Sequence, residues 1–489
     1  MSHVPAKAIP HLHEKALVGG SWVSAPSGGV IDVTNPADGM RVGSVPNLDA
    51  SGALAAVAAA ENALPAWRGL SAQQRAAHLR RWHGLVLEHI EGLAHLLTTE
   101  QGKTLAEARG EIAYGATFIE WFAEEAKRVY GDTIPAPKAG SRIIVQKQPV
   151  GVVAAIIPWN FPSALFNRKV AAALAAGCTV VVKPSEFTPF SALALAALAE
   201  QAGLPKGVVN VVTGDPAPIG EALMASPVVR KISFTGSTRV GKLLLAQAAQ
   251  TVKRTSMELG GNAPLIVFDD ADIPTAVQAC MNSKFRNAGQ TCVCANRIYV
   301  QDGIYAAFSR ALVAAVERLK VGPGLSEGVT IGPLINRAAV AKVERHIADA
   351  VAKGGRIVLG GTRHALGGTF FEPTVIEGAT DEMDLAHDET FGPVAPLFRF
   401  ADEAEAIALA NATSYGLASY IFTASLDRMW RVTDALETGM VGVNEGLISN
   451  EVAPFGGIKE SGLGREGSRY GIDEYLEQKY IMISPALAA

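Results

Sequence analysis

The chain has 489 residues, 49% hydrophobic and 18% charged, enough apolar material for a large core and a length typical of roughly three domains. Its net charge of −4 comes without a block of like charges, so we expect no nucleic-acid partner. The longest small-apolar run, residues 170–182, is shorter than the about 20 residues that span a bilayer, and residues 1–15 hold no hydrophobic leader. We therefore expect a cytoplasmic protein with no membrane partner.

The first half of the chain predicts helices followed by an alternation of strands and helices. Residues 48–100 and 103–130 are alanine-rich, with helical periodicity and few breakers. Strands are then expected at 152–157, 179–183, 208–213 and 231–235, and helices at 164–176 and 191–202. This alternation is typical of a parallel, doubly wound sheet. Residues 142–148, which mix polar and β-branched side chains, predict part of an inserted hairpin.

A second alternation follows residue 258. Its strands are expected at 264–268, 297–300, 355–359 and 371–376, which predicts a second domain starting near residue 259. Cys292 would then face the first domain across a cleft.

Cys292 lies in residues 285–297 among small and amide side chains, with two arginines close by. A cysteine is nucleophilic only as its thiolate, which needs partial exposure and nearby dipoles or positive charge. We expect Cys292 to be a nucleophile, and a buried structural thiol is the alternative. The cysteines at 178, 280, 292 and 294 lack the paired spacing of a zinc site or a disulfide framework, so reduced thiols and no metal are expected.

Cys294 is a separate question because it stands two positions after Cys292. In an extended segment the two side chains would share a face, yet lie too far apart to bond without distortion. We expect Cys294 to be a packing residue, and a regulatory disulfide with Cys292 is the alternative.

Two further polar residues are candidates for the same site. Asn160 follows an apolar run that stops at Pro158, and its amide could form an oxyanion hole together with the Cys292 backbone N–H. Glu258 precedes Gly260 and Gly261, which allow close backbone approach. Read singly, Asn160 could be a turn residue and Glu258 an ordinary carboxylate.

These segments, with the blocks at residues 183–186, 234–238, 389–393 and 454–457, resemble the aldehyde dehydrogenase superfamily over nearly the whole chain. The resemblance implies an α/β fold of two doubly wound, Rossmann-like parallel-sheet domains with a small β oligomerisation arm. The expected ranges are 1–126 and 149–258 for the NAD(P)-binding domain, 259–474 for the catalytic domain, and 127–148 and 475–489 for the arm. A homodimer or homotetramer is expected.

The resemblance also implies covalent catalysis. Cys292 attacks an aldehyde carbon, Asn160 and the Cys292 N–H hold the oxyanion, and Glu258 activates the water that hydrolyses the thioester.

No G-x-G-x-x-G follows an early strand, so the usual dinucleotide fingerprint is absent. Residues 236–241 instead form a glycine-bounded turn that could place a helix N-terminus at a pyrophosphate. By resemblance, the cofactor-binding residues are Trp159, Lys169, Lys183, Ser185, Glu186, Gly214, Gly236, Ser237, Gly241, Glu389, Phe391 and Phe455. Glu186 would accept hydrogen bonds from the ribose of NAD and repel the 2′-phosphate of NADP, so NAD is preferred and NADP possible.

Arg168 and Arg286 are close in sequence to the catalytic residues and suit bidentate binding of a carboxylate. Together with Ser449 they resemble the carboxylate-binding positions of succinate-semialdehyde dehydrogenases, so we expect an aldehyde with a carboxylate tail. Residues 164–167 depart from that pattern, and Phe166 could reshape the tail pocket. Glutarate semialdehyde or another ω-oxo acid is therefore the alternative substrate.

Two other classes of function are considered. A cysteine hydrolase or acyltransferase could use Cys292, but it would leave the cofactor segments unexplained. A catalytically silent binding protein is opposed by the intact set of Asn160, Glu258 and Cys292.

Overall fold

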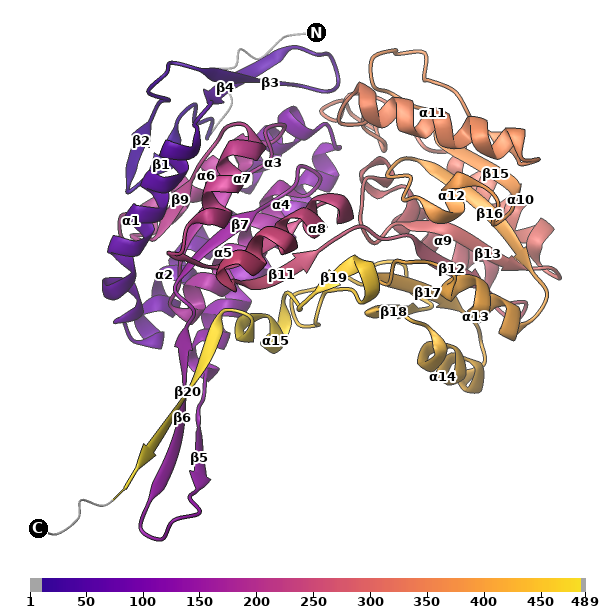
Figure 1. Ribbon diagram of the computed structural model, residues 1–489. Coiled ribbons are helices and arrows are strands. Elements are labelled where there is room, and N and C mark those ends of the chain that lie inside the picture. The colour runs from indigo at the N-terminus through magenta and orange to yellow at the C-terminus, as the bar shows by residue number, and fades with distance from the viewer. Residues whose placement is uncertain (1–10, 485–489) are drawn as a thin grey trace, which may run out of the picture.

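The computed structural model describes residues 11–484, which form two α/β units and a projecting three-stranded arm (Figure 1). Two ends of the predicted ranges lie outside the described residues: residues 1–10 of the first domain and residues 485–489 of the arm. Most of residues 1–15, where no hydrophobic leader was expected, also lies outside them. Among the described residues, no helix combines the length and the apolar run needed to cross a membrane.

The first unit contains an eight-stranded sheet with a parallel centre and antiparallel edges. Its strands, in spatial order, are β19 (Gly462–Leu463), β11 (Arg254–Glu258), β10 (Val229–Thr235), β7 (Val152–Ile156), β8 (Thr179–Lys183), β9 (Val209–Val211), β1 (Ala16–Val18) and β2 (Ser21–Val23). The chain runs from β7 outward to β9 and then returns to the other side of β7 with β10. In open α/β sheets, ligands bind outside the carboxyl ends of the strands at such a switch point.

Helices cover both faces of this sheet, so its central strands are buried on both sides. Val153 and Ala155 pack with one set of helices, and Val152 and Ala154 with the other, as the two-residue period of a strand requires. On the first face lie α2 (Ala72–Glu88), α3 (Ile90–Gln101), α4 (Leu105–Glu125), α5 (Pro162–Ala176) and α6 (Pro189–Gln201). On the second lie α1 (Ala50–Arg68), α7 (Pro216–Ala225) and α8 (Thr238–Ala248).

The alanine-rich stretch at residues 48–130 is helical as predicted, but it is divided into four helices. Ser71 starts α2 by accepting a hydrogen bond from Gln74 N. Gly102 ends α3 in the left-handed region at φ 98°, and Thr104 starts α4 with a reciprocal capping box to Glu107.

The second unit contains a seven-stranded sheet that is parallel except at one edge, where β14 pairs antiparallel with β15. Its strands, in spatial order, are β14 (Arg356–Leu359), β15 (Thr374–Ala379), β16 (Val394–Phe400), β13 (Ala295–Gln301), β12 (Ala263–Val267), β17 (Ala418–Phe422) and β18 (Met440–Val443). Its helices are α9 (Ile273–Lys284), α10 (Tyr305–Val316), α11 (Arg337–Ala352), α12 (Asp384–His387), α13 (Glu403–Asn411) and α14 (Leu426–Ala435).

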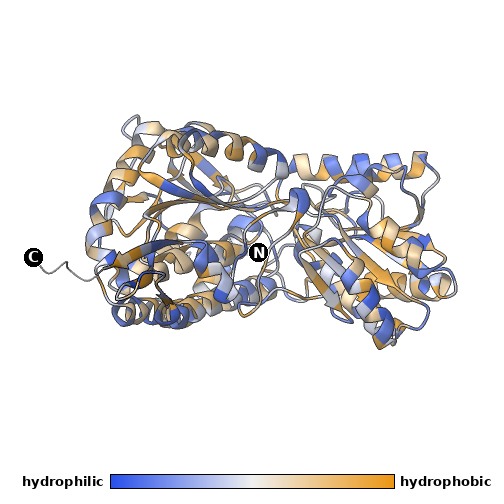
Figure 2. Ribbon diagram, turned by 60° about the horizontal axis from the view of Figure 1, so that its bottom comes forward, coloured by the Kyte–Doolittle hydropathy of each residue, from blue (hydrophilic) through white to orange (hydrophobic). Residues whose placement is uncertain are grey.

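The predicted class of two doubly wound parallel-sheet units is confirmed. Figure 2 shows that helices around both sheets mix hydrophobic and hydrophilic residues, as expected of helices with one buried side. One segment crosses between the units: β19 and α15 (Ser468–Asp473) pack on the first unit, although they fall within the range 259–474 assigned to the second.

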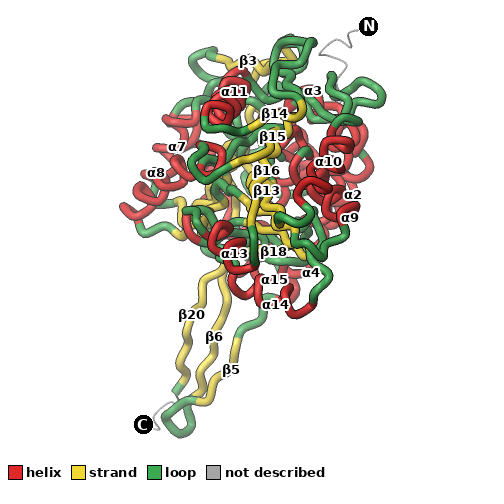
Figure 3. The backbone as a smooth tube through the Cα atoms, turned by 90° about the vertical axis from the view of Figure 1, so that its right-hand side faces the viewer, coloured by secondary structure: helices red, strands yellow, loops and turns green. Residues whose placement is uncertain are grey.

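The arm is a separate antiparallel sheet, ordered β20 (Leu476–Ile483), β6 (Arg142–Pro149) and β5 (Asp132–Pro135). It extends away from the body in two perpendicular views (Figures 1 and 3). A further hairpin, β3 (Val30–Thr34) with β4 (Arg41–Pro46), lies near the N-terminus.

Candidate active site

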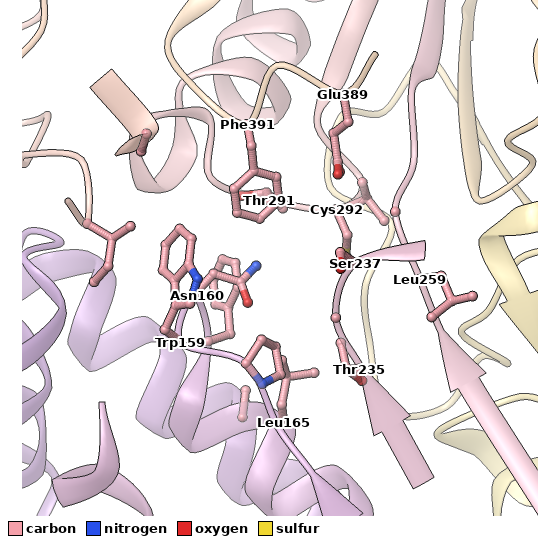
Figure 4. A pocket seen from close by; sticks show the side chains of 18 of the residues that line it. Trp159, Asn160, Leu165, Thr235, Ser237, Leu259, Thr291, Cys292, Glu389 and Phe391 are labelled. Atoms are coloured by element: carbon pink, nitrogen blue, oxygen red, sulfur yellow. The ribbon is translucent and has the colours of Figure 1, made fainter. Parts of the chain in front are cut away.

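A cavity of about 660 Å³ lies between the two units, at the carboxyl ends of β7 and β10. The first unit supplies the loop after β7 and the turn after β10, and the second supplies the loop before β13. Figure 4 shows Asn160, Cys292, Ser237 and Glu389 around this one cavity. The chain therefore brings residues about 130 positions apart into one site, at the switch point of the first sheet.

Cys292 lines the cavity and is only partly exposed. Burial, together with the carboxylates of Glu389 and Glu258, raises the pKa of Cys292 to about 12. We expected positive charge to favour the thiolate, but the carboxylates outweigh Arg168 here. A pKa raised this far favours the thiol, which must lose its proton before Cys292 can act as a nucleophile.

Cys294 is buried, and its Sγ lies 3.5 Å from the Lys284 carbonyl oxygen. The segment around Cys294 is a turn and not extended: Cys294 N donates to Thr291 O (3.1 Å). All four cysteines are free thiols, and Cys294 has the packing position that we predicted.

Asn160 is buried in the loop after β7 and lines the cavity. Its Nδ2 donates to Gln290 O (3.1 Å), and its Oδ1 has no hydrogen-bond partner. An amide nitrogen carries two hydrogens, so one remains available for a ligand in the cavity. The side chain is thus placed to donate to an oxyanion.

Glu258 ends β11 and is buried, but it does not line the cavity; its neighbours Leu259 and Gly260 do. The carboxyl group is turned toward Gly456, where an added Cβ would lie 2.8 Å from Oε1. Both carboxyl oxygens lack a hydrogen-bond partner. Burial and the nearby Glu466 raise the pKa of Glu258 well above its ordinary value. Glu258 is nonetheless near enough to Cys292 for its charge to raise the pKa of that thiol.

The two arginines predicted to bind a carboxylate differ in their surroundings. Arg168 is buried, donates to Tyr114 Oη (2.7 Å), and pairs with Glu466 at 3.4 Å. Arg286 lines the cavity with its guanidinium 4.8 Å from the centre of the Phe161 ring. Within residues 11–484, Arg286 has no carboxylate within 4.0 Å, so its charge is available to a ligand.

Ser449 also lines the cavity, and so does Tyr114, which the sequence analysis did not identify. Phe166, which we expected to reshape the tail pocket, is instead fully buried in the core, with its ring 6.2 Å from that of Trp82. Leu165 and Arg168, three positions apart on α5, face the cavity, whereas Phe166 points toward α2.

Several predicted cofactor residues line the same cavity: Trp159, Gly236, Ser237, Glu389, Phe391 and Phe455. The rings of Trp159 and Phe391 meet edge to face, with centroids 5.5 Å apart. Glu389 Oε1 accepts a hydrogen bond from Gly261 N (3.3 Å), and burial raises the pKa of Glu389 to about 7. The cavity is also lined by Arg239, by Lys342 and by the residues at the start of α11, none of which a local sequence pattern had indicated.

The remaining predicted cofactor residues lie elsewhere. Lys169 is buried and does not line the cavity; it pairs with Glu466 and donates to Ser233 Oγ (3.2 Å). Lys183, Ser185 and Glu186 are at the carboxyl end of β8, and Lys183 Nζ is 3.2 Å from Glu186 Oε2.

Gly214 follows β9, and Gly241 lies within α8, where an added Cβ would be 2.4 Å from Leu259 Cδ2. The residues at the ends of β8 and β10 flank the switch point and suit a dinucleotide. Ser237 caps α8, whose N-terminal N–H groups face this region, and the buried Thr235 Oγ1 lacks a partner. An added Cβ at Gly236 would lie 2.4 Å from the Phe234 ring, so a larger residue in this turn would displace that ring.

Comparison with known proteins identifies the family. The aldehyde dehydrogenase family model matches residues 22–481. The chain is 61% identical over 470 residues to the glutarate-semialdehyde dehydrogenase of Pseudomonas aeruginosa, covering 96% of this chain and 97% of the relative. It is 60% identical to the NADP(+) succinate-semialdehyde dehydrogenase of Escherichia coli, with 96% and 98% covered. The succinate-semialdehyde dehydrogenase structure from Burkholderia pseudomallei superposes with a TM-score of 0.96 at 59% identity, over 97% and 98% of the two chains. The chain belongs to the aldehyde dehydrogenase family.

Proposed function

We propose that the protein oxidises succinate semialdehyde to succinate, with reduction of NAD(P). The observation that carries this proposal is the unpaired guanidinium of Arg286, in the same cavity as Cys292 and Asn160. A charged hydrogen-bond donor there suits the carboxylate of the substrate tail, and the hydroxyl of Ser449 supplies a second donor. Relatives named for succinate semialdehyde support this substrate class.

Glutarate semialdehyde is the second candidate, because two relatives at 61% and 58% identity are named for it. It differs from succinate semialdehyde by one methylene group. A change of that size in a pocket is worth about 1–3 kcal/mol, so one site can accept both.

In the proposed mechanism, Glu258 rotates from Gly456 toward the cavity and accepts the proton of the Cys292 thiol. The thiolate then attacks the aldehyde carbon, and Asn160 Nδ2 and the Cys292 N–H hold the oxyanion of the thiohemiacetal. The bound nicotinamide cofactor supplies the hydride acceptor that this oxidation requires.

Hydrolysis completes the turnover. Cys292 now carries the acyl group as a thioester. Glu258 passes the thiol proton to solvent, and its carboxylate then removes a proton from a water molecule. The water oxygen bonds to the acyl carbon, the carbon–sulfur bond breaks, and the carboxylic acid leaves. The thiolate of Cys292 is restored, and the proton held by Glu258 passes to solvent.

The residues at the carboxyl end of β8 support NAD as the preferred cofactor, with NADP use possible. Glu186 presents a carboxylate next to Lys183, and this charge favours ribose hydroxyls over a 2′-phosphate. The Escherichia coli relative is named for NADP(+), so the two cofactors must be compared directly. A higher kcat/KM with NADP than with NAD would contradict the preference.

The arm supports assembly into a homodimer or homotetramer. Apolar side chains of β20 are exposed, with Tyr480 at 60%, Met482 at 42% and Ile483 at 48%. A strand that exposes apolar residues and an unpaired edge is a template for association with another chain. The cytoplasmic location stays a prediction from the sequence.

A steady-state panel of acetaldehyde, succinate semialdehyde and glutarate semialdehyde tests the proposal. We expect NADH formation with the highest kcat/KM for one of the two acids. Equal kcat/KM for acetaldehyde would refute recognition of a carboxylate tail. Hydrolysis of esters without any aldehyde-dependent NADH would instead indicate a cysteine hydrolase.

A further inference from the structure

A lysine and a glutamate with fully buried side chains lie beneath the loop that carries Asn160. Lys103 follows Gly102 at the end of α3, and Glu111 lies on the buried side of α4. Lys103 Nζ is 2.5 Å from Glu111 Oε2, and both side chains are 0% exposed. Neither residue lines the cavity, and neither takes part in the chemistry proposed above.

Lys103 makes a second hydrogen bond, and this one reaches the catalytic loop. Its Nζ donates to the backbone carbonyl oxygen of Asn160 (2.7 Å) and lies 4.0 Å from the centre of the Phe161 ring. Asn287 Nδ2 donates to the same carbonyl (3.1 Å). Two donors from different parts of the chain therefore fix the peptide group that follows the Asn160 side chain.

Glu111 holds the next part of the same loop. Its Oε1 accepts hydrogen bonds from Ser163 N (2.9 Å) and Ala164 N (3.2 Å), in the first turn of α5. A carboxylate at this end of a helix also interacts favourably with the helix dipole. The Lys103–Glu111 pair thus anchors both the Asn160 peptide and the start of α5.

The direction of the Asn160 amide depends on these anchors. Asn160 Nδ2 donates one of its hydrogens to Gln290 O (3.1 Å). The other hydrogen points toward the oxyanion only if the backbone of Asn160 is held in the correct position. A displacement of about 1 Å can reduce turnover by about a hundredfold.

We propose that Lys103 is a positioning residue, which holds the Asn160 backbone so that its amide meets the oxyanion. This inference rests on the proposed role of Asn160 as an oxyanion donor. The alternative is that the Lys103–Glu111 ion pair serves only to stabilise the fold. Buried ion pairs often add little to stability, because replacing both partners with apolar residues is often neutral.

A double-mutant cycle in the full-length protein tests the inference. We would measure kcat with succinate semialdehyde and NAD for Lys103→Met, Asn160→Ala and the double variant. We expect Lys103→Met to lower kcat by about tenfold to a hundredfold, with KM for NAD changed less than about twofold. In the Asn160→Ala background, the same substitution should cost less than about twofold. An equal loss in both backgrounds would overturn the inference.

Lys103→Met leaves Glu111 unpaired in the core, so it could fail to fold. The paired variant Lys103→Met with Glu111→Gln removes both charges and keeps an oxygen acceptor for Ser163 N and Ala164 N. Its kcat loss should match that of Lys103→Met, and it decides the question if the single variant is not recovered. Wild-type kcat in this paired variant would overturn the inference.

Lys231→Met is the matched control. Lys231 is also fully buried, and its Nζ donates to Ser256 Oγ (2.5 Å) in β11, away from the cavity. We expect its kcat to stay within about twofold of wild type. A loss as large as that of Lys103→Met would show a general effect of removing a buried charge.

The cycle separates failure of this inference from failure of the proposed function. Wild-type kcat in Asn160→Ala would refute the oxyanion role itself. A loss of about a hundredfold in Asn160→Ala, combined with independent losses from Lys103→Met, would refute only the positioning role.

Discussion

Replacing Arg286 with methionine removes a cavity-lining guanidinium that is free to bind a substrate carboxylate. Arg286 lies over the Phe161 ring and, within residues 11–484, has no carboxylate within 4.0 Å. Its removal therefore leaves no buried charge without a partner. We expect the variant to fold with nearly wild-type stability, and the change to be confined to recognition of the substrate tail.

The size of the effect follows from the lost interaction. A hydrogen bond to a charged group contributes about 1.5–3 kcal/mol, which corresponds to about a 10- to 150-fold change in kcat/KM. Arg286→Met should lose this much with succinate semialdehyde. It should change kcat/KM by less than about threefold with butanal, which lacks the carboxylate. The assay is steady-state NADH formation with each aldehyde.

Arg168→Met is the informative comparison, because Arg168 is buried and pairs with Glu466 and Tyr114. Removing one partner of a buried charge pair destabilises by about 3–5 kcal/mol, so thermal unfolding should show a loss that Arg286→Met does not. Equal losses of kcat/KM for the acid and for butanal in Arg286→Met would refute our reasoning.

Three further predictions concern the cavity and its cysteines. Gly456→Ala would place a Cβ 2.8 Å from the backbone oxygen of Gly464, so the main chain beside the cavity-lining Phe455 must shift. We expect turnover to fall by about tenfold or more, and unchanged turnover would mean that the site tolerates this shift. Burial and the nearby Glu466 raise the pKa of Glu258. Because the ionised carboxylate is the base, thioester hydrolysis should slow as the pH falls through that raised pKa. The kcat profile of a Glu258→Gln variant should lack this decrease at low pH. Cys294 is buried and free, so Cys294→Ala should keep kcat within about twofold of wild type. A regulatory disulfide would be supported if dithiothreitol restores the peroxide-treated wild type but not the peroxide-treated variant.

The central strands were predictable because their apolar runs are bounded by Gly, Pro and polar residues. Residues 152–157 and 179–183 agree with β7 and β8 to within one residue. The two-residue β19 was not predictable, because it exists only through pairing with β11 after the chain has returned to the first unit. Strands β16, β17 and β18 were also missed, although β17 is fully buried.

The candidate catalytic residues Cys292 and Asn160 could be singled out from local sequence, whereas the residues that contact their loops could not. Cys292 and Asn160 stand in segments whose chemistry is unusual for a core, and both line the cavity. Tyr114 and Lys103 act across tens of positions, so no local pattern places them at the site. Glu111 was the exception, because its sequence position indicates burial. It lies on the side of α4 that carries Ala108 and Ile112, and a buried carboxylate needs a buried partner.

The conformation of the site was the least predictable feature. The segment from Cys292 to Cys294 is a turn rather than extended, because Cys294 N bonds to Thr291 O. Glu258 faces Gly456 rather than the cavity, and its orientation depends on a glycine about 200 positions away in the sequence.

Mass spectrometry of the acyl-enzyme tests the central claim most directly. The Glu258→Gln variant is mixed with NAD and succinate semialdehyde, incubated for many wild-type turnover times and quenched in acid. It should carry one succinyl group on Cys292, because water can still accept the thiol proton slowly, whereas hydrolysis of the thioester has lost its base. Formation of NADH by this variant while Cys292 stays unmodified at every time point would contradict covalent catalysis at this residue.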